Sequence, residues 1–319
     1  MLPRFGVRYE YSFGRERGLY GAQIEQPLFP SGRVAFGVSV VRRTDHNELQ
    51  QVENFENTLA FLLARQDYHD YFEREGFGAY LAWRVPDFST VSIHARKDDY
   101  VTLAVDHSAR SWFYRDRDLR ENPVIDEGTA HTLSVRLERL AHRTSSTRAG
   151  YFHWIDLERA GYQMGGDFEY TRLLGDLRGV FRVSPAMTLA LRAVVGRTFD
   201  GDLTVQKEFT VGGVDGLRAH PFATYRGDQM ALAQAEYTVG IWRLRSPWLQ
   251  GGLHAMAFVD AGRAWNGTDY RYDLDKQQIR TDGGFRTGHL RRQPASVFRQ
   301  EPPGPRFPLR GQPEAAASF

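Results

Sequence analysis

Apolar and polar residues alternate with a period of two along most of the chain, and no other feature limits its fold as strongly. Successive side chains of a β-strand point to opposite faces, so each alternating run predicts a strand with one apolar face. The sequence therefore predicts an all-β, antiparallel fold. The runs span residues 3–13, 19–29, 34–41, 77–85, 91–96, 133–138, 149–158, 172–183, 187–196, 231–241 and 253–260.

The connections between these runs are alternately short and long, and their lengths separate two kinds of β protein. Alternation alone does not, because a soluble β-sandwich also has one apolar and one polar face. Long structureless loops are uncommon inside compact domains. Short turns at one end and long loops at the other are typical of outer-membrane barrels. We therefore predict an antiparallel transmembrane β-barrel. The short turns lie at residues 30–33, 86–89, 143–148 and 184–186, and the long segments at residues 42–75, 97–128 and 198–229.

The composition is compatible with a barrel and excludes several other classes. The 319 residues carry a formal net charge of +2, which gives no indication of nucleic-acid binding, and no cysteine, which excludes disulfides and thiol chemistry. No apolar run approaches the roughly 20 residues that a membrane helix needs. The mean hydropathy of −0.50 fits barrel strands, because their polar residues offset their apolar ones. The first residues also lack the pattern of a signal peptide.

Two features of the first long segment interrupt the strand pattern. Residues 54–73 read as a short amphipathic helix, which we expect to pack on a neighbouring loop. Within it, residues 67–70 offer two carboxylates and an imidazole, but no second cluster completes a metal site, so we expect a surface loop. The chain shows no set of nucleophile, base and orienting residue. We therefore predict no enzymatic activity, no catalytic residue, no metal and no cofactor.

A series of motifs between residues 209 and 262 places an Arg in a Gly-rich loop and carboxylates on the two runs that follow. If Tyr237 and Val259 face lipid, the alternation turns Glu236 and Asp260 toward the inside of the barrel. A charge inside a barrel needs a partner, and an Arg–carboxylate pair is the strongest available. The glycines permit a sharp turn and a close approach to the wall. The motif residues are Gly212, Gly213, Gly216, Leu217, Arg218, Ala219, His220, Glu236, Phe258, Asp260 and Gly262.

This series of motifs resembles the bacterial surface-antigen barrel of the BamA/TamA superfamily. In that superfamily, an inward-folded outer loop carries Val-Arg-Gly-Phe/Tyr, the next strand carries an inward Glu, and the strand after that carries Phe-x-Asp-x-Gly. The resemblance implies that Arg218 is the loop-tip Arg and that it pairs with Asp260 and Glu236 on the wall. The chain departs from the pattern at Ala219, which replaces a Gly, and at His220, which replaces an aromatic residue.

The resemblance also implies a strand count and a domain division. Barrels of the superfamily usually have sixteen strands, with the motif loop between the eleventh and the twelfth. Counting back from residues 230–241 as the twelfth makes residues 3–13 the third. We therefore expect residues 1–267 to be an incomplete part of such a barrel, without the first two strands and the periplasmic domains. We expect residues 268–319 to be an atypical tail in place of the last three strands, either disordered or translated from a shifted reading frame.

Two classes of function are compatible with this interpretation. The resemblance implies a bacterial outer-membrane protein that inserts or secretes other proteins, with outer-membrane lipid and client proteins as partners and no nucleic acid. The alternative is a passive barrel, which serves as a membrane anchor or a porin-like pore. A truncated product without function is a further alternative, because an open barrel leaves two unpaired strand edges that lipid cannot satisfy.

Overall fold

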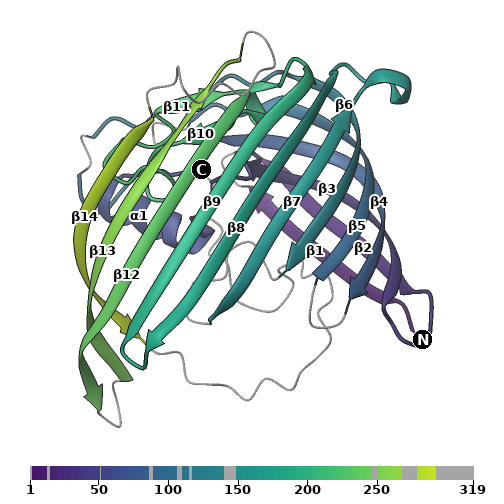
Figure 1. Ribbon diagram of the computed structural model, residues 1–319. Helices are drawn as coiled ribbons and strands as arrows, with labels where there is room; N and C mark the ends of the chain where they lie inside the picture. The colour runs from purple at the N-terminus through teal and green to yellow at the C-terminus, as the bar shows by residue number, and fades with distance from the viewer. Residues whose placement is uncertain are drawn as a thin grey trace.

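One antiparallel sheet of twelve strands forms the wall of the molecule. The fold is that of a computed structural model, in which residues 2–12, 15–50, 52–85, 89–105, 110–114, 117–139, 149–245, 250–267 and 279–291 are described. The strands follow one another in chain order, except that β9 lies next to β12, and the sheet curls into an incomplete cylinder (Figure 1). They are β1 Arg4–Ser12, β2 Arg17–Pro27, β3 Val34–His46, β4 Tyr71–Val85, β5 Ser89–Thr102, β6 Gly128–Arg139, β7 Gly150–Ala160, β8 Tyr170–Ser184, β9 Met187–Gly201, β12 Gln229–Arg245, β13 Gln250–Trp265 and β14 Arg280–Arg291.

The two faces of this wall have the opposite polarity to those of a soluble protein. On β4, the outward side chains of Phe77 and Trp83 are 61% and 56% exposed, whereas the inward Tyr80 and Ala82 are buried. Charged side chains such as Asp176 and Asp260 are buried on the inner face. Apolar groups turned outward and polar groups turned inward are the arrangement of a barrel in lipid. The predicted all-β antiparallel transmembrane barrel is therefore confirmed.

Most strands extend further at the loop end of the barrel than the alternation indicated. We use loop end for the end where the chain connects β3 to β4, β5 to β6, and β9 to β12. There, β4 begins at Tyr71 and β5 ends at Thr102, although their alternating runs cover only residues 77–85 and 91–96. Beyond the lipid, both faces of a strand meet water or loops. The apolar face is then no longer selected, and alternation stops before the strand does.

Strand β14 corrects the expectation that residues 268–319 form an atypical or disordered tail. It pairs with β13 over twelve register positions, from Gly251 opposite Arg291 to Gly262 opposite Arg280. The strand was missed because Gly283, Gly284 and Gly288 interrupt its apolar alternation. The wall therefore continues past residue 267. The expectation for residues 292–319 lies outside the described residues.

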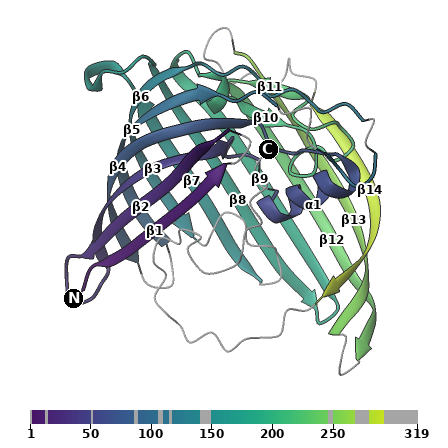
Figure 2. The same ribbon diagram turned by 180° about the vertical axis from the view of Figure 1, so that it is seen from behind.

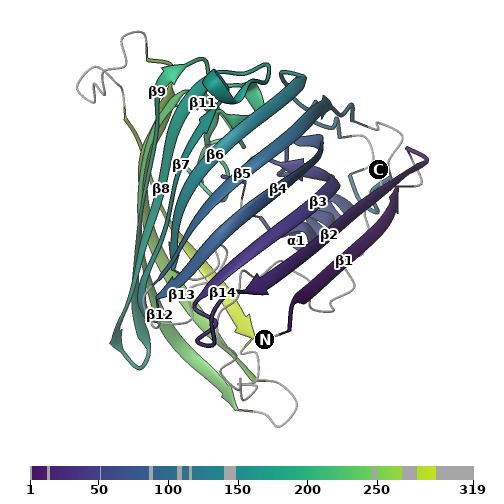
Figure 3. The ribbon, with the colours of Figure 1, turned by 90° about the vertical axis from the view of Figure 1, so that its right-hand side faces the viewer.

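The sheet does not close on itself in the described part of the chain. β1 has only β2 as a neighbour and β14 has only β13, so these two strands form the edges of the sheet (Figure 3). Taking β1 as a third strand makes β9 the eleventh and β12 the twelfth, as the count from the sequence expected. This open sheet is consistent with an incomplete part of a larger barrel.

The helix α1, Asn54–Ala64, lies on the concave side of the sheet (Figure 2). It is shorter than the predicted span of residues 54–73, because Arg65 adopts a left-handed conformation with φ of 51° and ends it. Strand β4 then begins at Tyr71. No helix in the described residues combines the length and the apolar character needed to cross a bilayer.

The register of β14 can be tested by thiol cross-linking, since the chain has no cysteine of its own. Val259 lies opposite Gly283, so the pair Val259→Cys and Gly283→Cys is expected to cross-link in high yield under mild oxidation. The control pair, Ala255→Cys with Gly283→Cys, is four residues out of register, which separates the thiols by about 14 Å. Equal yields for the two pairs in denaturing gels would contradict the register.

Candidate functional site

The connection between β9 and β12 folds back into the barrel, and apolar packing holds it there. It contains the 3-10 helix η2, Val205–Lys207, and a ribbon of β10, Phe209–Val211, and β11, Tyr225–Gly227. We name residues 202–228 the lumen loop. Phe209, Val211 and Leu217 are at most 1% exposed and belong to one apolar cluster with side chains of the inner wall. The other members of the cluster are Leu49, Trp154, Leu174, Val194, Met230, Leu232 and Ala264.

The tip of the lumen loop is a compact turn that depends on its glycines. Gly212 and Gly213 have φ values of 132° and 82°, which L-residues with side chains rarely adopt. The Gly213 N–H donates to the carbonyl oxygens of Leu217 and His220, each at 3.1 Å. A Cβ atom on Gly216 would lie 2.6 Å from the Gly212 nitrogen. Because the turn is this tight, the side chain of Arg218 projects from a fixed position.

Arg218 reaches the wall with its whole guanidinium group. Nε and Nη2 donate to the two carboxylate oxygens of Asp260, each at 2.7 Å, and Nη1 lies 2.7 Å from Glu236 Oε1. The guanidinium carbon lies 4.1 Å from the centre of the Phe258 ring. Asp260 is fully buried and the Arg218 side chain is 15% exposed. A bidentate pair with a second carboxylate and a ring face fixes both position and orientation.

The strand register explains why the wall residues meet at one point. Glu236 lies opposite Phe258, and Gln234 lies opposite Asp260. Their side chains therefore share the inner face. Gly262 lies on the same face, opposite Leu232, and a Cβ atom there would lie 2.9 Å from Leu232 Cδ1. The motif glycine thus leaves room for a side chain of the apolar cluster.

A third carboxylate on the wall holds the loop tip, and sequence analysis missed it. Asp282 of β14 lies directly opposite Asp260. It accepts hydrogen bonds from the Ala219 N–H at 3.0 Å and from His220 Nδ1 at 3.0 Å. The two positions where the chain departs from the superfamily pattern therefore contact the same carboxylate. Because Gly283 and Gly284 interrupt the alternation after Asp282, the sequence holds no clear local signal for this residue.

The wall also binds the backbone of the lumen loop. Gln234 Nε2 donates to the Gly216 carbonyl at 2.9 Å. Arg192 Nη1 donates to the Asp215 carbonyl at 2.9 Å and to Gln234 Oε1 at 3.0 Å. Arg192 is held in turn by Asp176, with Nη2 and Oδ2 2.9 Å apart. The loop tip is therefore bound by strands β9, β12, β13 and β14 together.

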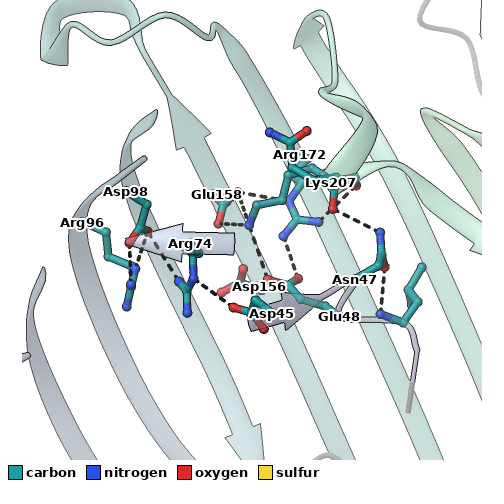
Figure 4. Close-up of polar contacts among 12 residues, drawn as sticks. Asp45, Asn47, Glu48, Arg74, Arg96, Asp98, Asp156, Glu158, Arg172 and Lys207 are labelled. Atoms are coloured by element: carbon teal, nitrogen blue, oxygen red, sulfur yellow. Dashed lines mark hydrogen bonds and ion pairs between the residues drawn. The ribbon is translucent and has the colours of Figure 1, made fainter. Parts of the chain in front are cut away.

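A separate charge cluster fixes the start of the lumen loop (Figure 4). Lys207 Nζ lies 3.2 Å from Glu158 and 3.5 Å from Glu48. Arg172 donates to Glu48 at 2.7 Å and to Glu158 at 3.2 Å. Desolvation opposes the charge of Glu48, but Arg172 and Lys207 outweigh it and hold the pKa of the Glu48 carboxyl below its ordinary value. Desolvation likewise opposes the charge of Lys207, but Glu158 and Glu48 raise the pKa of the ammonium group.

The loop between β3 and β4 packs against the lumen loop. Asn47 Nδ2 donates to the carbonyls of Gln206 and Glu208 at 3.2 and 2.8 Å. Arg226 Nη2 lies 2.5 Å from Asp70 Oδ2. His69 and Asp70 are 1% and 5% exposed, so the expectation that residues 67–70 form a surface loop was wrong. Two contacts account for this burial: His69 stacks on His46, with ring centres 3.9 Å apart, and Asp70 pairs with Arg226 of the lumen loop. No group of three metal-ligating side chains with metal-site geometry occurs in the described residues.

The Omp85 superfamily domain matches residues 4–289, which is most of the chain. The chain belongs to the Omp85 superfamily. The resemblance to BamA/TamA-type barrels that the motifs indicated is therefore confirmed. No curated protein sequence matches the chain.

A solved structure shows the same Omp85 barrel fold. It is the crystal structure of BamA from Haemophilus ducreyi lacking POTRA domains 1–3, with a TM-score of 0.55 and 12% sequence identity. The similarity covers 92% of this chain but 64% of that one, so the chain spans less than two thirds of that relative. At 12% sequence identity, this similarity shows the fold alone.

The energetic role of the Arg218–Asp260 pair can be measured by comparing a single variant with a double variant that lacks both charges. Arg218→Ala leaves the buried Asp260 carboxylate without its guanidinium partner, so we expect the free energy of unfolding to fall by about 3–5 kcal/mol. The double variant Arg218→Met with Asp260→Leu removes both charges and is expected to lose less than Arg218→Ala. Urea unfolding in detergent measures each value.

The control for this comparison is Arg8→Ala, which removes an exposed cation that pairs with Glu10 on β1. Its expected cost is below about 1 kcal/mol. A cost for Arg218→Ala no larger than that of Arg8→Ala would show that the lumen pair does not stabilise the barrel.

The stability that the ion pairs among Lys207, Arg172, Glu48 and Glu158 provide is expected to be independent of pH over a wide range. Glu48 contributes stability that is present above its unfolded pKa of about 4.3 and is lost only as pH falls through its lower folded value. Lys207 contributes stability that is present below its unfolded pKa of about 10.4 and is lost only as pH rises through its higher folded value. Lys207→Met should therefore cost a constant amount, about 3 kcal/mol, between about pH 5 and pH 9. A cost that vanishes within this window in urea titrations would contradict the charge assignment.

Proposed function

We propose that the chain is the membrane barrel of a bacterial outer-membrane protein that inserts other proteins into that membrane or secretes them across it. Membership of the Omp85 superfamily supports this proposal. The observation that carries it is the lumen loop, which Arg218 fastens to two carboxylates of the inner wall. The proposed partners are outer-membrane lipid and unfolded client proteins.

The occupied lumen favours this function over a porin-like pore. Phe209 and Leu217 of the lumen loop are fully buried between the walls. Lys207 and Arg218 attach the loop at two separate points. Porin-like barrels keep a water-filled lumen. A loop that packs in an apolar cluster inside the barrel fits a barrel whose interior is occupied by protein rather than filled with solvent.

The edges of the sheet support the same proposal. Lipid offers no hydrogen bonds, so the outer backbone groups of β1 and β14 must be paired in a membrane. An extended client segment is one chemical match, because strand addition satisfies an edge through main-chain hydrogen bonds. Strands of the same protein are the other match. Client insertion next to such an edge would use the same backbone chemistry that joins β13 to β14.

The test is a folding assay with the protein expressed from its own gene and reconstituted in liposomes. A urea-unfolded outer-membrane barrel serves as client, and its protease-resistant fraction is followed in time. We expect the client to fold faster than in protein-free liposomes, and Arg218→Ala to lower the rate by about tenfold or more, because about 1.4 kcal/mol of barrier suffices for that change. The matched control is Arg159→Gln, which removes an exposed cation on the outer face of β7, distant from both sheet edges, and it should keep the full rate.

A passive barrel gives a different result in the same liposomes. It would leave client folding at the protein-free rate while ions cross the membrane. That outcome would replace assembly or secretion by a porin-like function. An unchanged client rate with no ion flux would favour a membrane anchor.

A further inference from the structure

The outer surface of the wall carries a groove of about 690 Å³ across β2 to β6. Two rows of outward side chains form its sides. Register places Ala22, Val40, Phe77, Lys97 and His131 in one row across the five strands. In the neighbouring row, Ile24, Val38, Ala79 and Ala95 are likewise in register. The backbone between the rows forms the floor, and the groove faces the surroundings rather than the lumen.

The groove is apolar along most of its length and basic at one end. The sides at β2, β3 and β4 are aliphatic or aromatic, and small residues such as Ala79 and Ala95 keep the groove open. Lys97 and His131 form the last two positions of their row, and Met164 of the 3-10 helix η1, Tyr162–Met164, lines the same groove. His131 Nδ1 donates to the Met164 carbonyl at 2.6 Å. A basic end on an apolar groove suits an amphiphile with a negative head.

Lys97 is exposed on the outer face, and among the described residues no side-chain hydrogen bond or ion pair engages its ammonium group. The carboxylates of the next row have partners of their own. Glu75 accepts from Tyr20 Oη at 2.8 Å, and Asp99 accepts from Thr129 Oγ1 at 2.5 Å. Lys97 lies just past the alternating run of residues 91–96, and so at the edge of the lipid, where a lysine charge costs little. Its ammonium group is therefore available to an anion at the membrane interface.

The position of the basic end relative to the loops indicates how such a ligand lies. Lys97 is five residues before the end of β5, and His131 is three residues after the start of β6. Both are thus near the loop end of the wall, whereas the second row lies further from it. A head group at Lys97 would sit near the membrane interface, and a chain lying along the groove would contact the apolar side chains of β2, β3 and β4.

We propose that this groove binds one acyl chain of a phosphate-bearing lipid, with the lipid phosphate on Lys97 Nζ and beside His131. Phosphate is the anion that lipid head groups offer at that depth, and a lysine ammonium binds it as a point charge. The proposal rests on the placement of the barrel in a membrane. It does not depend on client insertion.

Native mass spectrometry of the protein in detergent tests the proposal with three probes. These are phosphatidic acid, diacylglycerol with the same chains but no phosphate, and inorganic phosphate with no chain. We expect one phosphatidic acid to be retained at concentrations where neither diacylglycerol nor inorganic phosphate is. Equal retention of phosphatidic acid and diacylglycerol would overturn the role of the charge, and binding of inorganic phosphate alone would overturn the role of the groove.

Variants separate the head-group contact from the chain contact. Lys97→Gln should weaken phosphatidic acid binding by about tenfold, since a charge-assisted hydrogen bond is lost, and Lys97→Arg should retain it. Ala79→Phe should block the chain while the charge remains. The matched control is Arg197→Gln, because Arg197 lies on the outward face of β9, over the Phe199 ring, and does not line the groove. Equal losses for Lys97→Gln and Arg197→Gln would show general charge attraction and overturn the site.

The lipid test and the client test fail independently. If phosphatidic acid is not specifically retained but client folding is still accelerated, the lipid site is overturned and the proposed function stands. Specific retention by a protein that does not accelerate client folding would leave the groove on a barrel of another function.

Discussion

The buried carboxylate of Asp260 is the constraint on which the inner structure depends. It has no exposed surface, so its charge must be satisfied by the protein. Arg218 does this, but only if the lumen loop turns inward and its glycine turn keeps the guanidinium in place. Because breaking the pair would leave a buried charge, the loop position and the wall charge stabilise each other. The apolar cluster around Leu217 completes the same interface.

The sequence alone predicts those parts of the molecule whose structure follows from one local rule. Period-two alternation placed the strands and turned Glu236 and Asp260 inward. The motif order placed Arg218 opposite both of them. Three features were harder to predict from the sequence. The helix ends early because Arg65 is left-handed, and the strands extend past the lipid, where alternation stops. Strand β14 is rich in glycine and is defined by its pairing with β13.

The rest of the site depends on contacts between distant segments. Lys207 meets Glu48 across 159 residues of sequence, and Arg226 meets Asp70 across 156. Neither pair leaves a local pattern, since each side chain alone reads as an ordinary loop charge. The burial of Asp70 has the same origin. Such contacts follow from where two loops meet inside a curved wall, and a single sequence does not specify that meeting.

The lumen loop also has a mechanical consequence. A closed barrel keeps its curvature because its hydrogen bonds form a continuous hoop, and this sheet has no such hoop in the described residues. Here the loop spans the interior as a tie: its tip holds β13 and β14 through Asp260 and Asp282, and Arg226 holds Asp70 beside the start of β4. An outward displacement of β14 therefore acts on the contacts of the lumen loop as well as on the strand pairing with β13. The two halves of the open wall are connected through the interior as well as through the sheet.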